Sequence, residues 1–171
     1  VDEAGAPEKF LGAKMMTLPS TDGKLKPEDI RSVAHLRGNL HHAQPAVVSI
    51  TQATELGTLY TAQEVKNICE TAHELGMLVH MDGARITNAA AALGATPQAL
   101  RSFTIDAGVD VLSFGGTKAG LMFGEAVVFF NKSLATRVEY IRKQTTQLYS
   151  KMRFVSAQYV ELLQNDLMFK L

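Results

Sequence analysis

The sequence has little of what marks a disulfide-bonded, membrane-bound or nucleic-acid-binding protein. Its 171 residues include one cysteine, so no disulfide can form within the chain. Basic and acidic residues number 17 each, and the formal net charge of zero attracts the chain neither to nucleic acid nor to a membrane surface. No run approaches the roughly 18 apolar residues that cross a bilayer. We therefore expect no nucleic-acid partner and no membrane partner.

The single cysteine and the start of the chain bear on where the protein works. Cys69 lies on the apolar face of an expected helix, which favours a buried structural thiol in a reducing compartment. No signal peptide opens the sequence, so we expect a cytoplasmic protein. The chain begins at Val1 without an initiator methionine, and we do not expect this to be the natural start. Its apolar content of 46% is enough for one compact domain with a core.

Short apolar runs alternate with helical patterns along most of the chain. Each run has the composition of a buried parallel strand, and we expect strands at 46–50, 77–81, 109–113 and 125–131. Between them, a helix is expected from a Thr61 cap to Gly76, a second over 86–93 and a third from Pro97. Two consecutive βαβ units predict an α/β fold with a mainly parallel sheet sandwiched by helices.

The ends of the chain give weaker patterns. Residues 14–19 have the composition of a short strand, and a helix is expected to begin at Pro27. The loop that follows contains His41 and His42, which are a poor chelate because adjacent side chains point in different directions; we expect no metal site. From residue 133 to about 164 we expect the chain to be helical. The chain therefore divides into an α/β unit, 1–132, and a helical segment, 133–171.

Basic residues are spread along the expected C-terminal helix. Such a pattern is typical of a solvated helix face, and the alternative is that one of these cations meets the phosphate or carboxylate of a ligand. The residues are Arg137, Arg142, Lys143 and Arg153.

One stretch carries a candidate for covalent chemistry. The strand expected at 109–113 ends at Ser113 and opens into Gly115, Gly116, Thr117 and Lys118. Small neighbours let a ligand approach closely, and a lysine kept from water has its pKa lowered toward the reactive neutral amine. Such an amine can form a Schiff base with a carbonyl cofactor. A plain glycine-rich turn is the alternative.

A carboxylate is expected on the same edge of the sheet. Asp82 follows the strand expected at 77–81. Ligands of open α/β sheets bind beyond the carboxyl ends of the strands, so Asp82 and Lys118 should share one rim. Pyridoxal phosphate requires this pair, because a lysine holds its aldehyde and a carboxylate keeps its ring nitrogen protonated. The rim is therefore a candidate site for pyridoxal phosphate.

Three runs in this order and spacing resemble one known family. They are Thr51 through Thr58, His80 through Arg85 and Ser113 through Lys118, and they resemble the threonine aldolase and β-eliminating lyase group of fold-type-I pyridoxal phosphate enzymes. The resemblance covers residues 3–154. It implies the large domain of an aspartate aminotransferase-like fold, with its N- and C-terminal parts missing.

The resemblance implies roles for the strongest candidates. Lys118 would carry the cofactor, Asp82 would partner the ring nitrogen, and Arg85 would bind the substrate carboxylate or lie against the phenolic oxygen of the cofactor. A guanidinium suits a carboxylate through a bidentate pair. The alternatives are that Asp82 caps the following helix and that Arg85 makes a simple salt bridge.

Weaker candidates surround these residues. Ser113 and Thr117 are expected to orient the lysine or touch the phosphate, with ordinary turn hydroxyls as the alternative. Gln52 follows a strand on the same rim and is expected to line the cofactor site. His80 is either a supporting group or a satisfied core histidine.

The activity implied by the resemblance is retro-aldol cleavage of a β-hydroxy-α-amino acid, such as L-threonine or L-allo-threonine, to glycine and an aldehyde. Another carbon–carbon or β-eliminating lyase on the same scaffold is an alternative, and so is a catalytically incomplete fragment or binding domain. The resemblance also implies a homodimer or homotetramer with shared active sites and a small-molecule amino acid substrate.

Parts of the family pattern fall outside this sequence. The phosphate-cradling turn and the group that stacks on the cofactor would precede residue 1, and a second carboxylate-binding arginine would follow residue 171. Ala119 also stands where the family has a more polar residue. We therefore expect a fragment of a longer protein or a truncated relative.

Overall fold

The computed structural model describes residues 3–170, with the backbone alone for Asn165. Its four-stranded sheet has the order β1-β2-β3-β4, in which β1, β2 and β3 are parallel and β4 is antiparallel to β3. The strands are β1 (Val47–Thr51), β2 (Leu78–Gly83), β3 (Val111–Gly115) and β4 (Glu125–Phe129). The mainly parallel α/β fold is confirmed. The short connection between β3 and β4 accounts for the reversed last strand, because a parallel neighbour needs a longer crossover.

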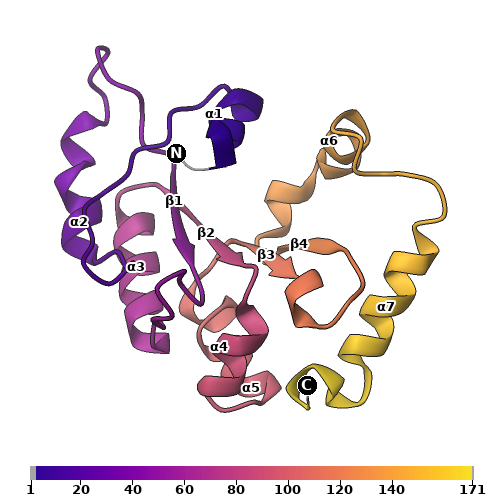
Figure 1. Cartoon of the computed structure of the whole chain (residues 1–171). Helices are drawn as coiled ribbons and strands as arrows, with labels where there is room; N and C mark the ends of the chain where they lie inside the picture. Colours follow the sequence, from indigo (N-terminus) through magenta and orange to yellow (C-terminus); the bar gives the residue numbers. More distant parts are fainter. Residues whose placement is uncertain (1–2, 171) are drawn as a thin grey trace.

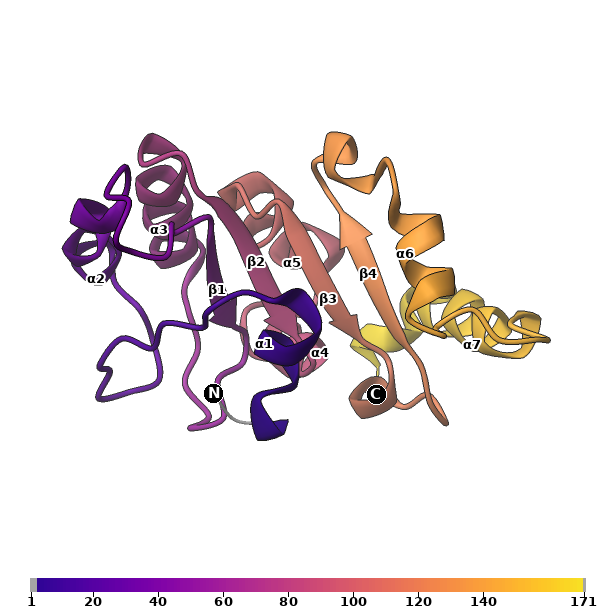
Figure 2. The ribbon, with the colours of Figure 1, turned by 90° about the horizontal axis from the view of Figure 1, so that it is seen from above.

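One face of the sheet is packed by helices. Helices α3 (Ala62–Glu74), α4 (Ile86–Ala92) and α5 (Pro97–Ser102) lie on this face, as Figures 1 and 2 show. Alternate residues of β2 point toward them, and Val79 and Met81 are completely buried. This is the hydrophobic core, and it holds the sheet rigid beneath the strand ends.

The longest helix begins and ends where the sequence indicates. The Thr61 side chain accepts a hydrogen bond from Glu64 N at 3.2 Å, and Glu64 Oε2 accepts one from Thr61 N at 2.7 Å. This capping box satisfies N–H groups that the helix itself cannot pair. Gly76 follows the helix at φ +69°, a left-handed conformation that suits glycine. Cys69 is buried in this helix, and burial raises the pKa of its thiol to about 12.

The opposite face of the sheet is open. It carries polar side chains at alternate positions, among them Ser49, His80, Asp82 and Ser113. Helix α1 (Ala6–Leu11) lies on this side in Figure 2 but contributes no buried residue. Within residues 3–170, the sheet is therefore covered by packed helices on one face rather than sandwiched on both.

The segment expected to be helical over 133–164 contains separate helices. The structure has α6 (Val138–Gln144) and α7 (Arg153–Leu163), separated by residues with left-handed backbone at Thr146 and Lys151. Thr145 ends α6, and its hydroxyl donates to Ile141 O at 2.8 Å instead of supporting another turn. Helix α7 returns to the α/β unit, where Leu162 is buried in the common core.

The strand expected at 14–19 is wrong, because no neighbouring strand pairs with it and the residues lie in irregular backbone. The helix expected from Pro27 is confirmed as α2 (Pro27–Ser32). No helix within residues 3–170 has the length and apolar character to span a membrane. Short 3-10 helices complete the described chain: η1 (Glu3–Gly5), η2 (Ala34–Leu36), η3 (Ile105–Ala107), η4 (Thr117–Ala119), η5 (Lys132–Ala135) and η6 (Gln164–Phe169).

Candidate active site

The carboxyl ends of the three parallel strands form one row of polar residues. The register pairs Thr51 of β1 with Asp82 of β2, and Asp82 with Ser113 of β3. Paired residues of neighbouring strands point to the same face, so these three side chains lie side by side on the open face. The expected rim therefore exists, with Asp82 at its centre.

Asp82 is the last polar residue of β2, and its carboxylate is held by the turn that follows. Its Oδ1 accepts a hydrogen bond from Ala84 N at 2.9 Å, while no residue of the described chain donates to Oδ2. Helix α4 begins at Ile86 with Arg85 at the N-cap position and no side-chain cap. The alternative that Asp82 caps this helix is therefore wrong, and one carboxylate oxygen is available to a ligand.

Two glycines bring the Asp82 turn and the Lys118 loop together. A Cβ added to Gly83 would lie 2.8 Å from Ser113 O, and one added to Gly115 would lie 2.6 Å from Ala84 Cα. Side chains at these positions would push β3 away from the turn. Because both residues are glycine, the backbone of the lysine loop packs directly against the turn that carries Asp82.

The lysine loop is closed by groups that lie beyond it in the sequence. The Glu125 carboxylate accepts hydrogen bonds from Gly116 N at 3.2 Å and Thr117 N at 3.3 Å. The Thr117 hydroxyl accepts one from Gly124 N at 3.1 Å. These bonds connect the start of the loop to the start of β4, so the short helix η4 is presented at a defined place on the rim.

Lys118 itself is exposed, and no described residue forms an ion pair with it. The expectation that it is kept from water is therefore wrong for the described chain. The small residues beside Lys118 do not shield it from water, because no packed layer lies above them on the open face of the sheet. The amine remains available for covalent chemistry, and η4 lies in contact with α4, next to Asp82 and Arg85.

Arg85 makes only a weak pair. Its Nη2 lies 3.9 Å from Glu55 Oε1, and the Glu55 side chain is 80% exposed. Exposed pairs of this length contribute little to stability. The guanidinium, which projects from the same turn as Asp82, is therefore available to an anion.

Gln52 is placed differently from expectation. It is fully buried, its Nε2 donates to Tyr60 O at 2.8 Å, and its Oε1 accepts from Tyr60 N at 3.0 Å. The side chain thus closes the loop between β1 and α3 from the inside. This position argues against the expected contact between Gln52 and a cofactor.

Two supporting residues were not given such roles by the sequence. Glu125 closes the lysine loop, and the Tyr159 hydroxyl of α7 donates to Phe114 O at 3.3 Å and Gly124 O at 3.1 Å. Burial raises the pKa of Tyr159 to about 12, so this hydroxyl stays a donor at neutral pH. His80, for which a supporting role was one of two alternatives, bridges two serines on the open face. No local sequence signal marks the contacts of Glu125 and Tyr159, because each joins different elements of the fold.

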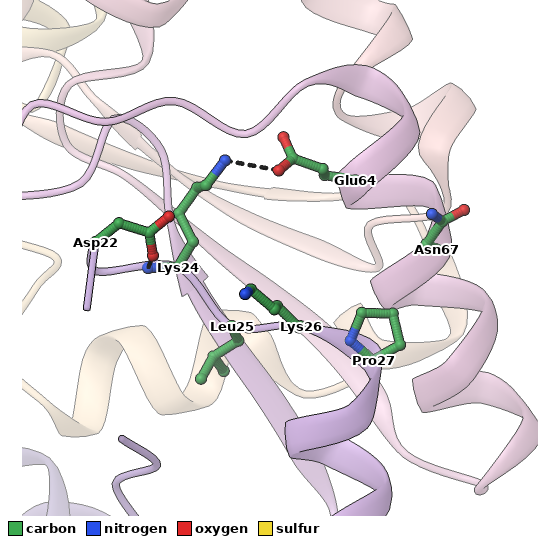
Figure 3. A pocket seen from close by; sticks show the side chains of 7 residues that line it. All are labelled: Asp22, Lys24, Leu25, Lys26, Pro27, Glu64 and Asn67. Carbon is green, nitrogen blue, oxygen red and sulfur yellow. Dashed lines mark hydrogen bonds and ion pairs between the residues drawn. The ribbon is translucent and has the colours of Figure 1, made fainter. Parts of the chain in front are cut away.

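Two cavities lie away from the rim row. A pocket of about 80 Å³ between α2 and α3 contains Lys24, whose Nζ pairs with Glu64 Oε1 at 2.6 Å (Figure 3). Because the charges of Lys24 and Glu64 are opposite, the centre of that pocket has no net charge. A larger apolar cavity of about 300 Å³ lies against the helix-covered face, between Leu100, Phe114 and Tyr159. Neither contains Lys118, Asp82 or Arg85.

The fold and the rim define a class of protein. It is an open α/β protein whose candidate ligand site lies at the carboxyl ends of parallel strands, where an amine, a carboxylate and a guanidinium are available. The chain belongs to the β-eliminating lyase family, whose sequence profile matches residues 1–169. This family depends on pyridoxal phosphate.

The chain is similar to proteins named as threonine aldolases. It is 53% identical over 165 residues to the low-specificity L-threonine aldolase of a Pseudomonas species, and 51% identical over 166 residues to that of Pseudomonas aeruginosa. Each alignment covers 96% of this chain but 47% of the relative, so the chain spans about half the length of these curated relatives.

Solved structures agree with this relationship. The threonine aldolase structure of Leishmania major matches with a TM-score of 0.90 and 35% identity, over 99% of this chain and 48% of that one. A structure from Listeria monocytogenes, 18% identical, matches with a TM-score of 0.69 and shows the shared fold.

Proposed function

We propose that the protein is a pyridoxal phosphate-dependent aldehyde-lyase of the threonine aldolase type. It cleaves the Cα–Cβ bond of a β-hydroxy-α-amino acid, giving glycine and an aldehyde, which is acetaldehyde for L-threonine and L-allo-threonine. The observation that carries the proposal is the placement of Lys118 and Asp82 at the ends of neighbouring parallel strands, with only glycine backbone packed between the two turns. The similarity to named threonine aldolases supports it.

The residues at the rim fit the two reactive ends of the cofactor. Lys118 offers an exposed amine for the aldehyde, and Asp82 Oδ2 accepts no hydrogen bond from the described chain. Gly115 and Gly116 pack directly against Ala84 and Gly124, where a Cβ would collide, and so bring the lysine loop close to the Asp82 turn. When bound, the cofactor supplies an electron sink for the pair of electrons left by bond cleavage.

Each residue then has a defined task. The Lys118 amine would hold the aldehyde end of the cofactor and give it up to the substrate amine. The available oxygen of Asp82 would keep a proton on the ring nitrogen. Arg85 would bind the substrate carboxylate through a bidentate pair, which would orient the bond to be broken. The hydroxyls of Ser113 and Thr117 have capacity for a further hydrogen bond, which the cofactor would take.

The proposal extends to assembly and location. Large apolar side chains are exposed on α6 and α7, among them Tyr140 (60%), Ile141 (54%) and Phe154 (60%). Such side chains are typical of surfaces covered by protein. We propose a cytoplasmic homodimer or homotetramer that acts on a small amino acid and has neither a nucleic-acid nor a membrane partner.

A second candidate is another lyase of the same family. Lys118 and Asp82 would serve β-elimination equally well, because both reactions leave an electron pair on Cα. The name of the family, β-eliminating lyase, supports this alternative.

The test uses the cofactor-loaded protein with L-threonine, L-allo-threonine, L-serine and L-tyrosine as separate substrates. Release of acetaldehyde and glycine from threonine is expected, whereas a ketoacid would indicate the β-eliminating alternative. Lys118→Ala should lose both the visible absorbance of the bound cofactor and the activity. Lys132→Ala, at another exposed lysine, is the matched control and should keep both. Absence of aldehyde from threonine at every concentration would refute the proposal.

A further inference from the structure

Three strands are connected by side chains on the open face. Ser49 Oγ of β1 lies 2.9 Å from His80 Nδ1 of β2, and His80 Nε2 lies 2.9 Å from Ser113 Oγ of β3. Both ring nitrogens of the histidine therefore have a hydroxyl partner. We call these three residues the serine–histidine bridge.

The bridge runs diagonally toward the rim. The register pairs Ser49 with His80, but it pairs Ser113 with Asp82, two residues further along β2. The imidazole of His80 therefore extends from the row of paired residues that contains Ser49 to the row that contains Asp82. Ser113 belongs to both arrangements, because it neighbours Asp82 in the sheet and is bonded to His80.

The open face carries both apolar and polar side chains. Val47, at the start of β1, and Val127, which pairs with Ser113, are β-branched residues that suit a pleated surface, and they are 55% and 58% exposed. The same face has two serines and a histidine that satisfy one another. Ser113 is the member of this polar cluster that lies in the row of the candidate carboxylate.

The electrostatics of the bridge leave the charge of Asp82 intact. Burial lowers the pKa of His80, and this effect outweighs the opposing attraction of the Asp82 carboxylate. The imidazole is consequently neutral at pH 7, with one nitrogen donating and the other accepting, and a serine hydroxyl can serve either. A protonated histidine here would compete with a ligand cation for the same carboxylate.

We propose that His80 is a positioning residue of the rim: held between Ser49 and Ser113, it keeps the Ser113 hydroxyl in place for the cofactor, beside Asp82 in the sheet. The inference rests on the proposed function for its ligand, pyridoxal phosphate. It assigns His80 a role through Ser113 and no contact with the reacting atoms.

The experiment titrates pyridoxal 5′-phosphate into the apo protein and follows the visible absorbance of the bound cofactor. His80→Phe keeps a ring but loses both hydrogen bonds, and its Kd should rise roughly tenfold, as is typical when a supporting partner is removed. The absorbance maximum should also shift, because the Ser113 hydroxyl beside Asp82 is no longer held. His80→Gln, whose amide can still bond a hydroxyl, should recover part of the affinity.

A second histidine provides the matched control. His73 Nε2 lies 2.9 Å from Asp110 Oδ2, next to the amino end of β3 and away from the rim row. His73→Gln should lower the melting temperature while the cofactor Kd and absorbance maximum stay at wild-type values. If His80→Phe behaves in the same way, His80 is a structural residue only and the inference is wrong.

Two further outcomes keep the test decisive. If His80→Phe does not fold, Ser49→Ala is the second variant, because it removes one hydrogen bond and keeps the imidazole. The Kd for the cofactor should then rise roughly threefold, as expected for one lost hydrogen bond. A wild-type Kd would overturn the inference. Wild-type protein that binds cofactor but releases no aldehyde from threonine would refute the proposed function, while the comparison of cofactor affinities would still decide the role of His80.

Discussion

Gly115 has no room for a side chain because the backbone of Ala84 lies against it. Gly115→Ala should therefore force β3 away from the Asp82 turn and lower the free energy of unfolding by about 1–3 kcal/mol, the usual cost of overpacking. Urea unfolding measures this, and cofactor affinity should fall with it. Gly12→Ala is the control: it has no atom within 4 Å of the added Cβ but a φ of +61°, so backbone strain of roughly 1 kcal/mol is its whole cost. Equal losses with unchanged cofactor affinity would contradict the prediction.

Lys24 and Glu64 form a residue pair that should respond to acid. Hydrogen bonding from Lys24 lowers the pKa of Glu64 from its ordinary value of 4.5, so the pair stabilises the fold above pH 4.5 and loses its effect as pH falls through the lowered pKa. Lys24→Met should reduce stability at pH 7 by at most about 1 kcal/mol, because Glu64 is 43% exposed and water screens the pair. Unfolding at pH 7 and at a series of values below pH 4.5 checks this, and a difference between variant and wild type that does not shrink as the pH falls would contradict the electrostatic account.

The candidate residues were predictable to different degrees. Lys118, Asp82 and Arg85 follow strand ends, and a strand end can be located from a local apolar run and its flanking glycines. Gln52 also follows a strand, yet its side chain turns inward to Tyr60. The choice between an inward and an outward rotamer depends on a partner eight residues away, which the local pattern does not specify.

At the scale of elements, α3 is the helix with the clearest local determinants. Thr61→Ala removes the hydroxyl that accepts from Glu64 N and should lower the free energy of unfolding by about 1 kcal/mol. Thermal or urea unfolding measures the loss. Gln63→Ala, at an exposed position in the same first turn, should change stability by a few tenths of a kcal/mol, about its difference in helix propensity. Similar losses in both variants would show that the cap has no special effect.

Elements without such determinants were predicted in less detail. The segment expected to be helical over 133–164 has no cap or glycine that marks a division, and the structure divides it into α6 and α7, with Thr146 and Lys151 in left-handed conformations between them. The expected strand at 14–19 has a suitable composition, but a strand exists only when another pairs with it. Local propensity therefore located α3 and the sheet strands, whose patterns agree with their packing, and failed where packing decided the outcome.

The whole molecule exposes more surface than a compact protein of its mass. Its accessible surface is 10806 Å², whereas roughly 8,200 Å² is expected for a monomer of 18.6 kDa. Apolar side chains contribute to the excess on the open face and on α6 and α7. This exposed apolar surface is consistent with the finding that the chain spans about half the length of its curated relatives.

The 171-residue chain by itself should therefore bind a hydrophobic dye and self-associate at micromolar concentration. Dye fluorescence and light scattering after size-exclusion chromatography measure both properties. Replacing Val47 and Val127 by threonine keeps β-branched residues on the open face and should reduce the dye signal. A monomer that binds no dye would contradict the prediction.

The sequence by itself determined the order of strands and helices, the ends of α3 and the positions of Lys118, Asp82 and Arg85 beside strand ends. These depend on apolar periodicity, caps and glycines within a few residues of one another. Only the tertiary structure decided that Glu125 closes the lysine loop, that Gln52 turns inward, that Lys118 is exposed, and that His80 bridges Ser49 and Ser113. The His80 contacts depend on the register between strands more than thirty residues apart, and the exposure of Lys118 depends on which face of the sheet is covered. The Glu125 and Gln52 contacts join residues eight or nine positions apart, which come together only when the loops between them fold.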